Sequence, residues 1–289
     1  MNSKAGDVTI VIPAKNEAET LPALLSKIKS ELPEFNVLVV DDGSTDETAA
    51  ISKKHGAKVI SLPYSLGNGG AVKTGVRSVK TRRLVLMDAD GQHSPEDIPR
   101  LLEGLDKGFD MVIGARGRES QANLGRAAAN SIYNRLAGWM VGRTIPDLTS
   151  GFRAADSAKF KEFLYLLPNG FSYPTTITMA FFRAGYSVEF VPITAGQRLS
   201  ESHISPLKDG VRFLLIIFRV GTLYSPLKLF FPLSVAFFLL GTAYYVYTYA
   251  VLNRFTNMGA VLFITSLLIF LIGLVSEQVT NLLYSHRDE

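Results

Sequence analysis

Residues 37–46 read VLVVDDGSTD, and this stretch indicates the fold of the first two hundred residues. Its four apolar residues, three of them β-branched, predict a short strand that is buried on both faces. Two aspartates follow directly, and the glycine, serine and threonine after them are typical of a turn between a strand and a helix. Residues 46–55 then predict a helix, which Ser44 or Thr45 could cap.

The same succession of strand and helix extends in both directions along the chain. Strands are expected at residues 8–12, 37–40, 58–62, 84–87 and 111–113, and helices at 17–30, 46–55, 70–79 and 95–106. This alternation implies crossover connections and a mostly parallel, Rossmann-like α/β sheet. Ligands of such sheets bind outside the carboxyl ends of the strands, so the residues that follow each strand form the candidate site.

Carboxylates, glycines and an arginine follow the predicted strands. They lie in residues 13–17, 41–46, 66–70, 88–93 and 114–116. Two charges at the end of a buried strand are costly, and a divalent cation bound between Asp88, Asp90 and phosphate oxygens would offset them. Each motif can also be explained as an ordinary turn or helix cap. Ser94, for example, could cap the helix that is expected to begin at Pro95. No single motif therefore identifies a site.

Two long uncharged stretches predict a membrane-spanning helical hairpin near the end of the chain. Residues 229–252 and 258–276 contain no charge, and each could cross a hydrocarbon core of about 30 Å. A pair of buried core helices is the alternative. Before them, residues 206–219 place cations on a narrow stripe and apolar residues around the rest, as in an interfacial helix, with a buried helix of a soluble protein as the alternative. The expected division is an α/β domain at 1–205, a juxtamembrane amphipathic segment at 206–228 and a hairpin at 229–285, with spans at about 229–252 and 258–280.

Charge and composition bear on the compartment and the partners. The chain has no cysteine, so disulfides and thiolate chemistry are excluded, and its net charge of +4 fits a phosphate or a membrane surface. No nucleic-acid partner is expected. Residues 8–12 are too short an apolar run for a signal peptide. Basic residues gather outside the hairpin turn, which places the α/β domain and both termini in the cytoplasm; they are Lys208, Arg212, Arg219, Lys228 and Arg287, against Arg254 in the turn.

Four motifs together resemble glycosyltransferase family 2. They are VIPAKNE at residues 11–17, VDDGSTD at 40–46, MDADGQH at 87–93 and SGFR at 150–153. From about residue 7 to about residue 209 the chain is similar to the branch of dolichyl-phosphate mannose synthases and bacterial polyprenyl-phosphate glycosyltransferases. The resemblance implies a GT-A fold and an inverting, metal-dependent transfer of a hexosyl group. The donor would be a UDP- or GDP-linked sugar and the acceptor a polyprenyl phosphate at the cytoplasmic face of the membrane.

The resemblance also implies roles for individual residues. Asp90, Arg116 and Arg126 would be catalytic, and Mg²⁺ or Mn²⁺ would be held by Asp88, Asp90 and Gln92. The acceptor phosphate would meet Arg116, Arg126, Asn130 and Ser131. The nucleotide sugar would be bound by Pro13, Asn16, Glu17, Asp41, Asp42, Gly69, Asp88, Ala89, Asp90, Gln92, Arg198 and His203. In relatives a lysine often stands in place of His203, and a serine in place of Asn130.

The identity of the acceptor decides between mechanisms. A lipid monophosphate is mostly dianionic at neutral pH, so it needs no general base. A family 2 enzyme with another membrane or glycan acceptor would need one, and Asp147 is then the candidate, although it also suits a structural corner. A non-catalytic assembly partner with the same fold is a further alternative. The apolar hairpin could also mediate self-association.

Overall fold

The computed structural model describes residues 7–117, 124–170, 172–194, 196, 218, 221–222, 224–254 and 256–285; the side chains of residues 124–130, 252, 283 and 285 are not among those described. The chain forms two compact units. The first comprises Met1–Trp139 and Arg143–Phe213, and the second comprises Met140–Gly142 and Leu214–Glu289.

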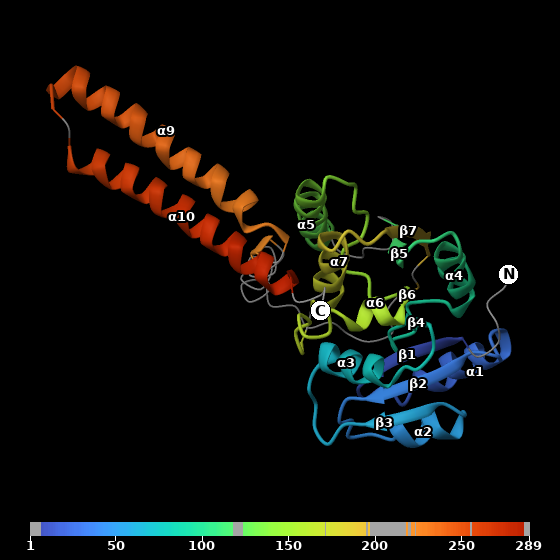
Figure 1. Cartoon of the computed structure of the whole chain (residues 1–289). Helices are drawn as coiled ribbons and strands as arrows, with labels where there is room; N and C mark the ends of the chain where they lie inside the picture. Colours follow the sequence, from blue (N-terminus) through green and yellow to red (C-terminus); the bar gives the residue numbers. More distant parts are fainter. Residues whose placement is uncertain are drawn as a thin grey trace. The chain divides into compact units, whose positions relative to one another are not determined.

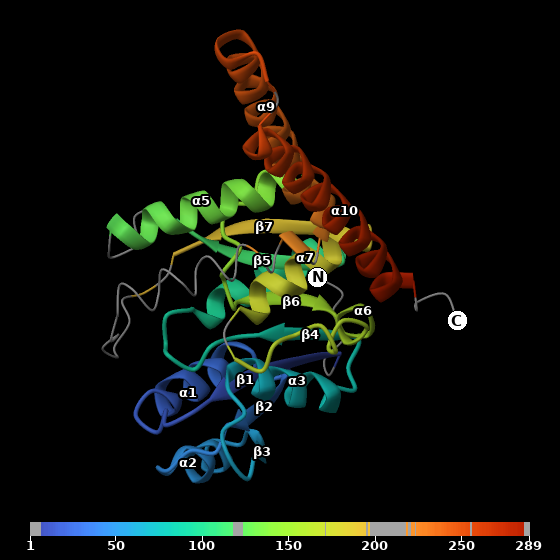
Figure 2. The ribbon, with the colours of Figure 1, turned by 90° about the vertical axis from the view of Figure 1, so that its left-hand side faces the viewer.

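The first unit contains a seven-stranded sheet in the order β3-β2-β1-β4-β6-β5-β7 (Figures 1 and 2). In this sheet β6 is antiparallel to its neighbours β4 and β5, and the other pairings are parallel. The predicted, mostly parallel α/β sheet is therefore confirmed. The strands are β1 (Val8–Ala14), β2 (Asn36–Asp41), β3 (Lys58–Ser61), β4 (Arg83–Leu86), β5 (Met111–Arg116), β6 (Arg153–Asp156) and β7 (Val188–Ile193).

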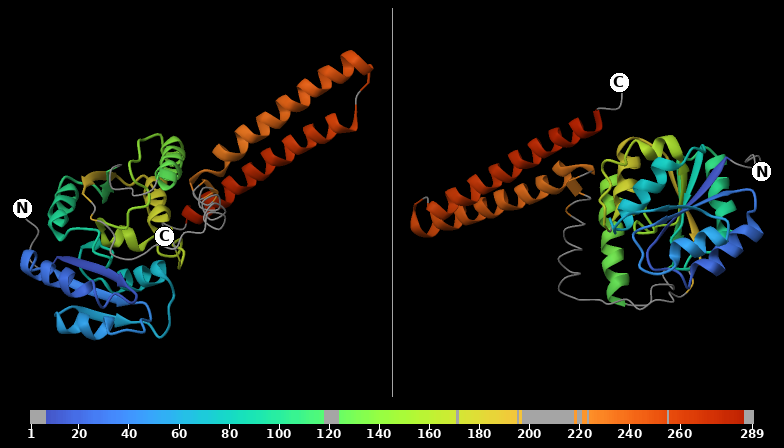
Figure 3. Two further views of the ribbon diagram at one scale, coloured as in Figure 1. Left: turned by 180° about the vertical axis from the view of Figure 1, so that it is seen from behind. Right: turned by 90° about the horizontal axis from the view of Figure 1, so that it is seen from below.

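Helices cover both faces of this sheet (Figure 3). Ile10 and Val39 point to the face where α1 and α4 add Ile28 and Leu101 to one buried cluster. The neighbouring strand residues point the other way, and Val11 lies against α3 there. The helices of this unit are α1 (Leu21–Glu31), α2 (Thr48–Lys54), α3 (Asn68–Ser78), η1 (Pro95–Asp97), α4 (Ile98–Asp106), α5 (Leu124–Val141), α6 (Ser157–Lys161) and α7 (Tyr173–Arg183).

The expected helix caps are wrong. Neither Ser44 nor Thr45 caps α2, and the carboxylate of Asp46 instead accepts the backbone N–H of Thr48 there (3.0 Å). Ser94 does not cap η1. The hydroxyl of Ser44 instead accepts a hydrogen bond from the backbone N–H of Asn16 (3.0 Å), and the backbone N–H of Thr45 donates to the side-chain oxygen of Asn16 (2.9 Å). Ser94 accepts from the ammonium of Lys27 (3.0 Å). These polar side chains join neighbouring loops, which is a tertiary role that local sequence does not reveal.

The glycine-rich turn before α3 packs tightly against residues 168–170. Gly70 donates its backbone N–H to the carbonyl of Asn169 (2.8 Å), and Gly67 has a φ of +90°. A Cβ on Gly69 would overlap the carbonyl oxygen of Pro168, so only glycine fits there. A close approach of backbone to backbone therefore accounts for these glycines.

Replacing Gly69 with alanine is expected to destabilise the first unit by about 1–3 kcal/mol, because the added methyl group forces two backbone segments apart. Thermal unfolding of the purified full-length protein measures this. Gly170→Ala is the matched control, since Gly170 lies in the same contact and its Cβ would meet no atom within 4 Å. Equal melting temperatures for the two variants would contradict the packing argument.

The second unit is a pair of antiparallel helices, α9 (Pro226–Leu252) and α10 (Asn257–Ser285), shown side by side in Figure 1. Pro226–Val251 and Asn257–Leu282 are long and apolar enough to cross a membrane, and the most apolar 18 residues of each have mean hydropathies of 1.8 and 2.7. Only 11% and 17% of their most apolar windows are buried, which argues against two core helices of a soluble protein. The amphipathic helix expected at residues 206–219 lies outside the described residues, apart from Phe218.

Polar contacts fix the register of this hairpin. The hydroxyl of Ser266 donates to the carbonyl of Ser234 (2.9 Å) in the middle of the two helices. At the start of α9, the carboxylate of Glu277 accepts from the hydroxyl of Ser225 (3.0 Å) and the backbone N–H of Leu227 (3.2 Å). The first N–H groups of a helix lack partners within the helix, so Glu277 of α10 caps α9.

Candidate active site

The carboxyl ends of β1, β2, β4 and β5 bring the predicted site residues to one edge of the sheet. Because β6 runs the opposite way, it begins at this same edge, and its first residue, Arg153, pairs with Leu86 of β4 and Ile113 of β5. Residues 147–153 therefore enter the sheet between the aspartates that follow β4 and the arginine that ends β5. Gly114–Arg116 belong to β5 itself, where the sequence predicted them to follow it.

Asn16 and Glu17 join the loops that follow β1 and β2. Asn16 has a left-handed backbone (φ 55°), which aims its side chain at the turn after β2. The backbone N–H of Glu17 donates to the hydroxyl of Thr48 at the start of α2 (2.9 Å). Pro13 lies buried within β1, just before this loop. These hydrogen bonds thus hold the two loops together at the carboxyl ends of β1 and β2.

Asp41 and Asp42 hold loops in place through their carboxylates. Asp42 is only 3% exposed and accepts hydrogen bonds from the hydroxyl of Ser65 (2.7 Å) and the backbone N–H groups of Leu66 (2.7 Å) and Gly67 (2.9 Å). Asp41 accepts from the backbone N–H of Ser44 (2.9 Å). The pair of adjacent acids therefore shapes the turns after both β2 and β3.

Asp88 and Asp90 lie in the turn after β4. A Cβ on Gly151 would meet the carboxylate of Asp88 at 2.5 Å, so this carboxylate rests on the chain just before β6. The Nε2 atom of His93 lies 3.7 Å from the same carboxylate. The ring of His93 stacks on that of Phe152, with centroids 5.0 Å apart. Asp90 accepts a hydrogen bond from the backbone N–H of Gln92 (3.1 Å), which fixes the turn.

The donor atoms of this turn suit a hard divalent cation. Carboxylate and amide oxygens, as in Asp88, Asp90 and Gln92, are the ligands that Mg²⁺ and Mn²⁺ prefer. No cluster of three His, Cys, Asp or Glu side chains that could hold a metal is found within the described residues. The two carboxylates and the amide of this turn fit such a metal, and its remaining ligands would come from substrate phosphates and water.

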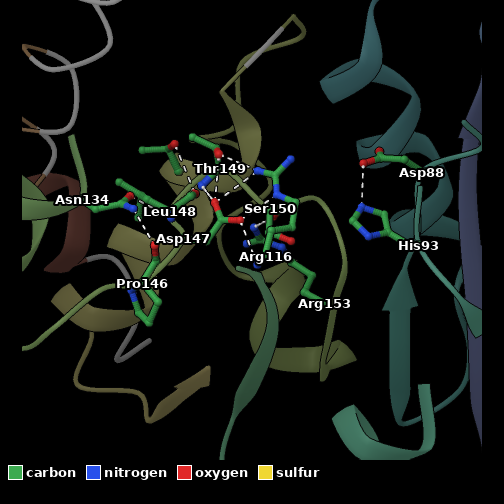
Figure 4. Close-up of polar contacts among 11 residues, drawn as sticks. Asp88, His93, Arg116, Asn134, Pro146, Asp147, Leu148, Thr149, Ser150 and Arg153 are labelled. Atoms are coloured by element: carbon green, nitrogen blue, oxygen red, sulfur yellow. Dashed lines mark hydrogen bonds and ion pairs between the residues drawn. The ribbon is translucent and has the colours of Figure 1, made fainter. Parts of the chain in front are cut away.

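Arg116 forms a bidentate ion pair with Asp147 (Figure 4). Its Nε donates to Oδ2 of Asp147 (2.7 Å), and its Nη2 donates to Oδ1 (3.2 Å) and to the hydroxyl of Thr149 (2.8 Å). Burial acts to lower the pKa of Arg116, but Asp147 raises it, through hydrogen bonding and then through its charge. The charges of Asp88 and Asp90 also raise the pKa of Arg116.

Arg153 is a fully buried cation beneath this edge. Its guanidinium donates to the carbonyl of Pro174 and the hydroxyl of Thr178 (both 3.1 Å), and also to the carbonyl of Ser150. Burial lowers the pKa of Arg153 to about 10, so it stays charged at neutral pH. In the described part of the chain, no carboxylate forms an ion pair with Arg153. It therefore adds positive charge below the site without contacting the open edge.

Other predicted residues are described only in part. Ala89 is buried between the two aspartates, and Ser131 lies half-buried on α5. Arg126 and Asn130 belong to α5, but their side chains lie outside the described set, as do Arg198 and His203 entirely. Three polar side chains at this site were not predicted from the sequence to have a role in it; they are His93, Asn134 and Thr149. The signal for Thr149 was its place in the motif that begins at Asp147.

Two family models match the chain. Residues 9–164 match Glycosyl transferase family 2, and residues 225–282 match the GtrB C-terminal hairpin. The second match, with the two apolar helices, indicates association with a membrane. The chain is similar to Glycosyltransferase AglJ of Haloferax volcanii, at 30% identity over 98% of this chain and 95% of that protein. It is also similar to the undecaprenyl-phosphate mannosyltransferase of Micrococcus luteus, at 36% identity over 68% of this chain and 87% of that protein.

Solved structures support the fold. One is glucosyl-3-phosphoglycerate synthase from Mycobacterium tuberculosis in complex with Mn²⁺, uridine-diphosphate and glucosyl-3-phosphoglycerate. It matches with a TM-score of 0.59 and 20% identity, over 74% of this chain and 78% of that chain. At this identity the likeness concerns the fold alone, and it confirms the predicted GT-A-like α/β domain.

Proposed function

Because the chain belongs to glycosyl transferase family 2, we propose that it transfers a hexosyl group from a nucleotide sugar to a polyprenyl phosphate. The observation that carries this proposal is that Asp147 is buried and paired with Arg116. The acid that could have served as a base is buried, and both of its oxygens bind Arg116. An acceptor that arrives already ionised, as a phosphate monoester does, needs no base.

The relatives support the choice of acceptor. Besides the undecaprenyl-phosphate mannosyltransferase, the polyprenol monophosphomannose synthase of Mycolicibacterium smegmatis is 31% identical over 65% of this chain and 77% of that protein. The first name specifies undecaprenyl phosphate and the second a polyprenol monophosphomannose, and the hairpin would hold the enzyme where such lipids are found. The donor would be a UDP- or GDP-linked sugar, and transfer would proceed with inversion at the anomeric carbon.

In the proposed reaction an oxygen of the acceptor phosphate attacks the anomeric carbon, and the bond from that carbon to the nucleoside diphosphate breaks. Arg116 would orient the acceptor phosphate for in-line attack. Asp88, Asp90 and Gln92 would hold Mg²⁺ or Mn²⁺, which stabilises the charge of the departing diphosphate when bound. The loops fixed by Asn16, Glu17, Asp41 and Asp42 would form the nucleotide pocket, with Arg198 and His203 as further contacts. Arg126, Asn130 and Ser131 would complete the acceptor site.

For the membrane, we propose that α9 and α10 both cross the bilayer, with the catalytic domain and both termini in the cytoplasm. The asymmetry of basic residues around the hairpin supports this orientation. The catalytic domain would comprise residues 1–205, and residues 206–228 would lie along the headgroups. The apolar outer surfaces of the two helices would also allow self-association within the bilayer.

The proposal is tested by transfer of radiolabel from a panel of UDP- and GDP-sugars to undecaprenyl phosphate, with and without Mg²⁺ or Mn²⁺. We expect a metal-dependent, acid-labile product in the organic phase, and the productive donor identifies the sugar. If folded protein binds a donor and yet forms no lipid product with any donor, the polyprenyl-phosphate acceptor is wrong.

A further inference from the structure

Asp147 is the most heavily hydrogen-bonded carboxylate at the proposed acceptor end of the site. Its side chain is 4% exposed. Oδ2 accepts from both the backbone N–H (3.3 Å) and Nε (2.7 Å) of Arg116. Oδ1 accepts from Nη2 of Arg116 and from the backbone N–H (3.0 Å) and hydroxyl (2.9 Å) of Thr149. Both oxygens therefore accept hydrogen bonds, Oδ2 from Arg116 and Oδ1 from Arg116 and Thr149.

These contacts make Asp147 a poor proton acceptor. Burial acts to raise its pKa, but hydrogen bonding and charge from Arg116, with further hydrogen bonds from Thr149, lower the pKa below its ordinary value. An effective general base has a pKa near the working pH and an oxygen within reach of the proton that it removes. Asp147 meets neither condition.

The same contacts fix one edge of the Arg116 guanidinium, and among the described residues nothing binds the other edge. Asp147 and Thr149 take up Nε and Nη2, whereas Nη1 donates to no atom of the described residues. The Arg116 side chain is 26% exposed, so the group is not sealed in. A guanidinium is planar and its donors point in fixed directions. Holding the Nε–Nη2 edge therefore also sets where Nη1 points.

The backbone around Asp147 is itself clamped by α5. The side chain of Asn134 donates to the carbonyl of Pro146 (2.6 Å) and accepts from the backbone N–H of Leu148 (3.1 Å), so it binds the chain on both sides of Asp147 (Figure 4). Asn134 lies one turn after Ser131 on the helix that carries the proposed acceptor residues. A shift of that helix would therefore move Asp147 as well.

We propose that Asp147 is a positioning residue that aims Nη1 of Arg116 at the acceptor phosphate, and that it is not the general base. This rests on the proposed function, since it assigns Arg116 to the polyprenyl phosphate. Asn134 and Thr149 complete the support, the first through the backbone and the second through Nη2. The acceptor phosphate would meet a guanidinium whose direction is set before the lipid arrives.

A double-mutant cycle tests the proposal in the full-length enzyme, with undecaprenyl phosphate as acceptor and the productive nucleotide sugar as donor. The variants are Asp147→Asn, Arg116→Met and the double variant. We expect Asp147→Asn to lower kcat/KM for the acceptor by about 100-fold, the cost of misplacing a reacting group by about an ångström. The KM for the donor should change less than about twofold. The double variant should lose little beyond Arg116→Met, because Asp147 acts through Arg116.

Two further variants separate positioning from stability. Thr149→Val keeps Asp147 but removes one partner of Nη2, and it should weaken the acceptor in the same direction by a smaller factor. Asp156→Asn is the matched control, because Asp156 caps α6 at the far end of β6 through the backbone N–H groups of Ala158 (3.0 Å) and Lys159 (3.1 Å). It should alter melting temperature without altering the KM for the acceptor.

The outcomes are distinguishable. Losses that multiply in the double variant, or an acid limb of the kcat–pH profile that disappears in Asp147→Asn, would show a base and overturn the proposal. A rise in KM for donor and acceptor together would show a purely structural role and overturn it as well. In both cases the wild-type enzyme still makes the lipid product. Failure of the wild-type enzyme itself to make that product would overturn the proposed function first.

Discussion

Asp90→Asn is expected to lower turnover about 10³-fold, the largest loss of any single substitution at the site, because it removes a charge from the proposed metal turn. Asparagine keeps the oxygen that accepts from the backbone N–H of Gln92, so the turn itself should persist. Donor binding should survive in part, since the loops after β1 and β2 are untouched. Transfer to undecaprenyl phosphate, together with Mn²⁺ binding in the presence of the donor, measures both effects.

Asp97→Asn is the matched control for Asp90→Asn. Asp97 lies seven residues further along, and its carboxylate pairs with Arg100 (2.7 Å) on the adjacent helical turn. Its replacement removes the same charge from the same segment but should leave turnover within about twofold of the wild type, since a partly exposed pair away from the proposed metal turn contributes little. An Asp90→Asn enzyme as active as the Asp97→Asn enzyme would rule out a metal role for Asp90.

The second large effect is expected from Asp42→Asn. Three donors converge on the Asp42 carboxylate, and an amide group must turn its own donors toward at least one of them. Leaving buried donors unsatisfied should lower the free energy of unfolding by about 3 kcal/mol. This corresponds to a fall in melting temperature of about 6–12 °C for a domain of this size. Thermal unfolding of the full-length protein in detergent provides the measurement.

Asp41→Asn is the comparison for Asp42→Asn. Asp41 is buried next to Asp42 in the chain, but its carboxylate accepts from the backbone N–H of Ser44, a hydrogen bond that an asparagine oxygen can still accept. A fall in melting temperature of only a few degrees is expected. If the two variants melt together, the three donors to Asp42 do not contribute as described.

Much of the fold could be predicted because local pattern and tertiary structure agree there. The five predicted strands are present, since short β-branched runs bounded by turn residues usually form buried strands. Strands β6 and β7 were not foreseen. Arg153-Ala154-Ala155-Asp156 carries no β-branched residue and no alternation, and it becomes a strand only because β4 and β5 leave a gap that its backbone fills. Tertiary context decides such a segment.

The residues that gather at the candidate site could be predicted, but not which of their side chains bind one another. The rule that ligands lie at the carboxyl ends of strands correctly gathered Asp88, Asp90 and Arg116. The sequence could not show that Asp147 would bind Arg116, because 31 positions separate them and β6 runs in the unexpected direction. Nor could it show that Ser44 and Thr45 serve Asn16, because both residues are equally good caps for the following helix.

The placement of β6 also has a consequence for how the chain folds on the ribosome. In the described sheet β5 pairs only with β6 and β7, so the earlier strands offer it no partner. Strands β1 to β4 can assemble as soon as they emerge, but β5 must wait on the order of seconds until residues 153–156 are synthesised. Meanwhile the open edge of β4 is exposed to wrong pairing. In a chain stalled before Arg153, strands β4 and β5, with Asp88 and Arg116, have therefore been synthesised. The two residues are not yet brought together, because β5 has not joined the sheet that contains β4.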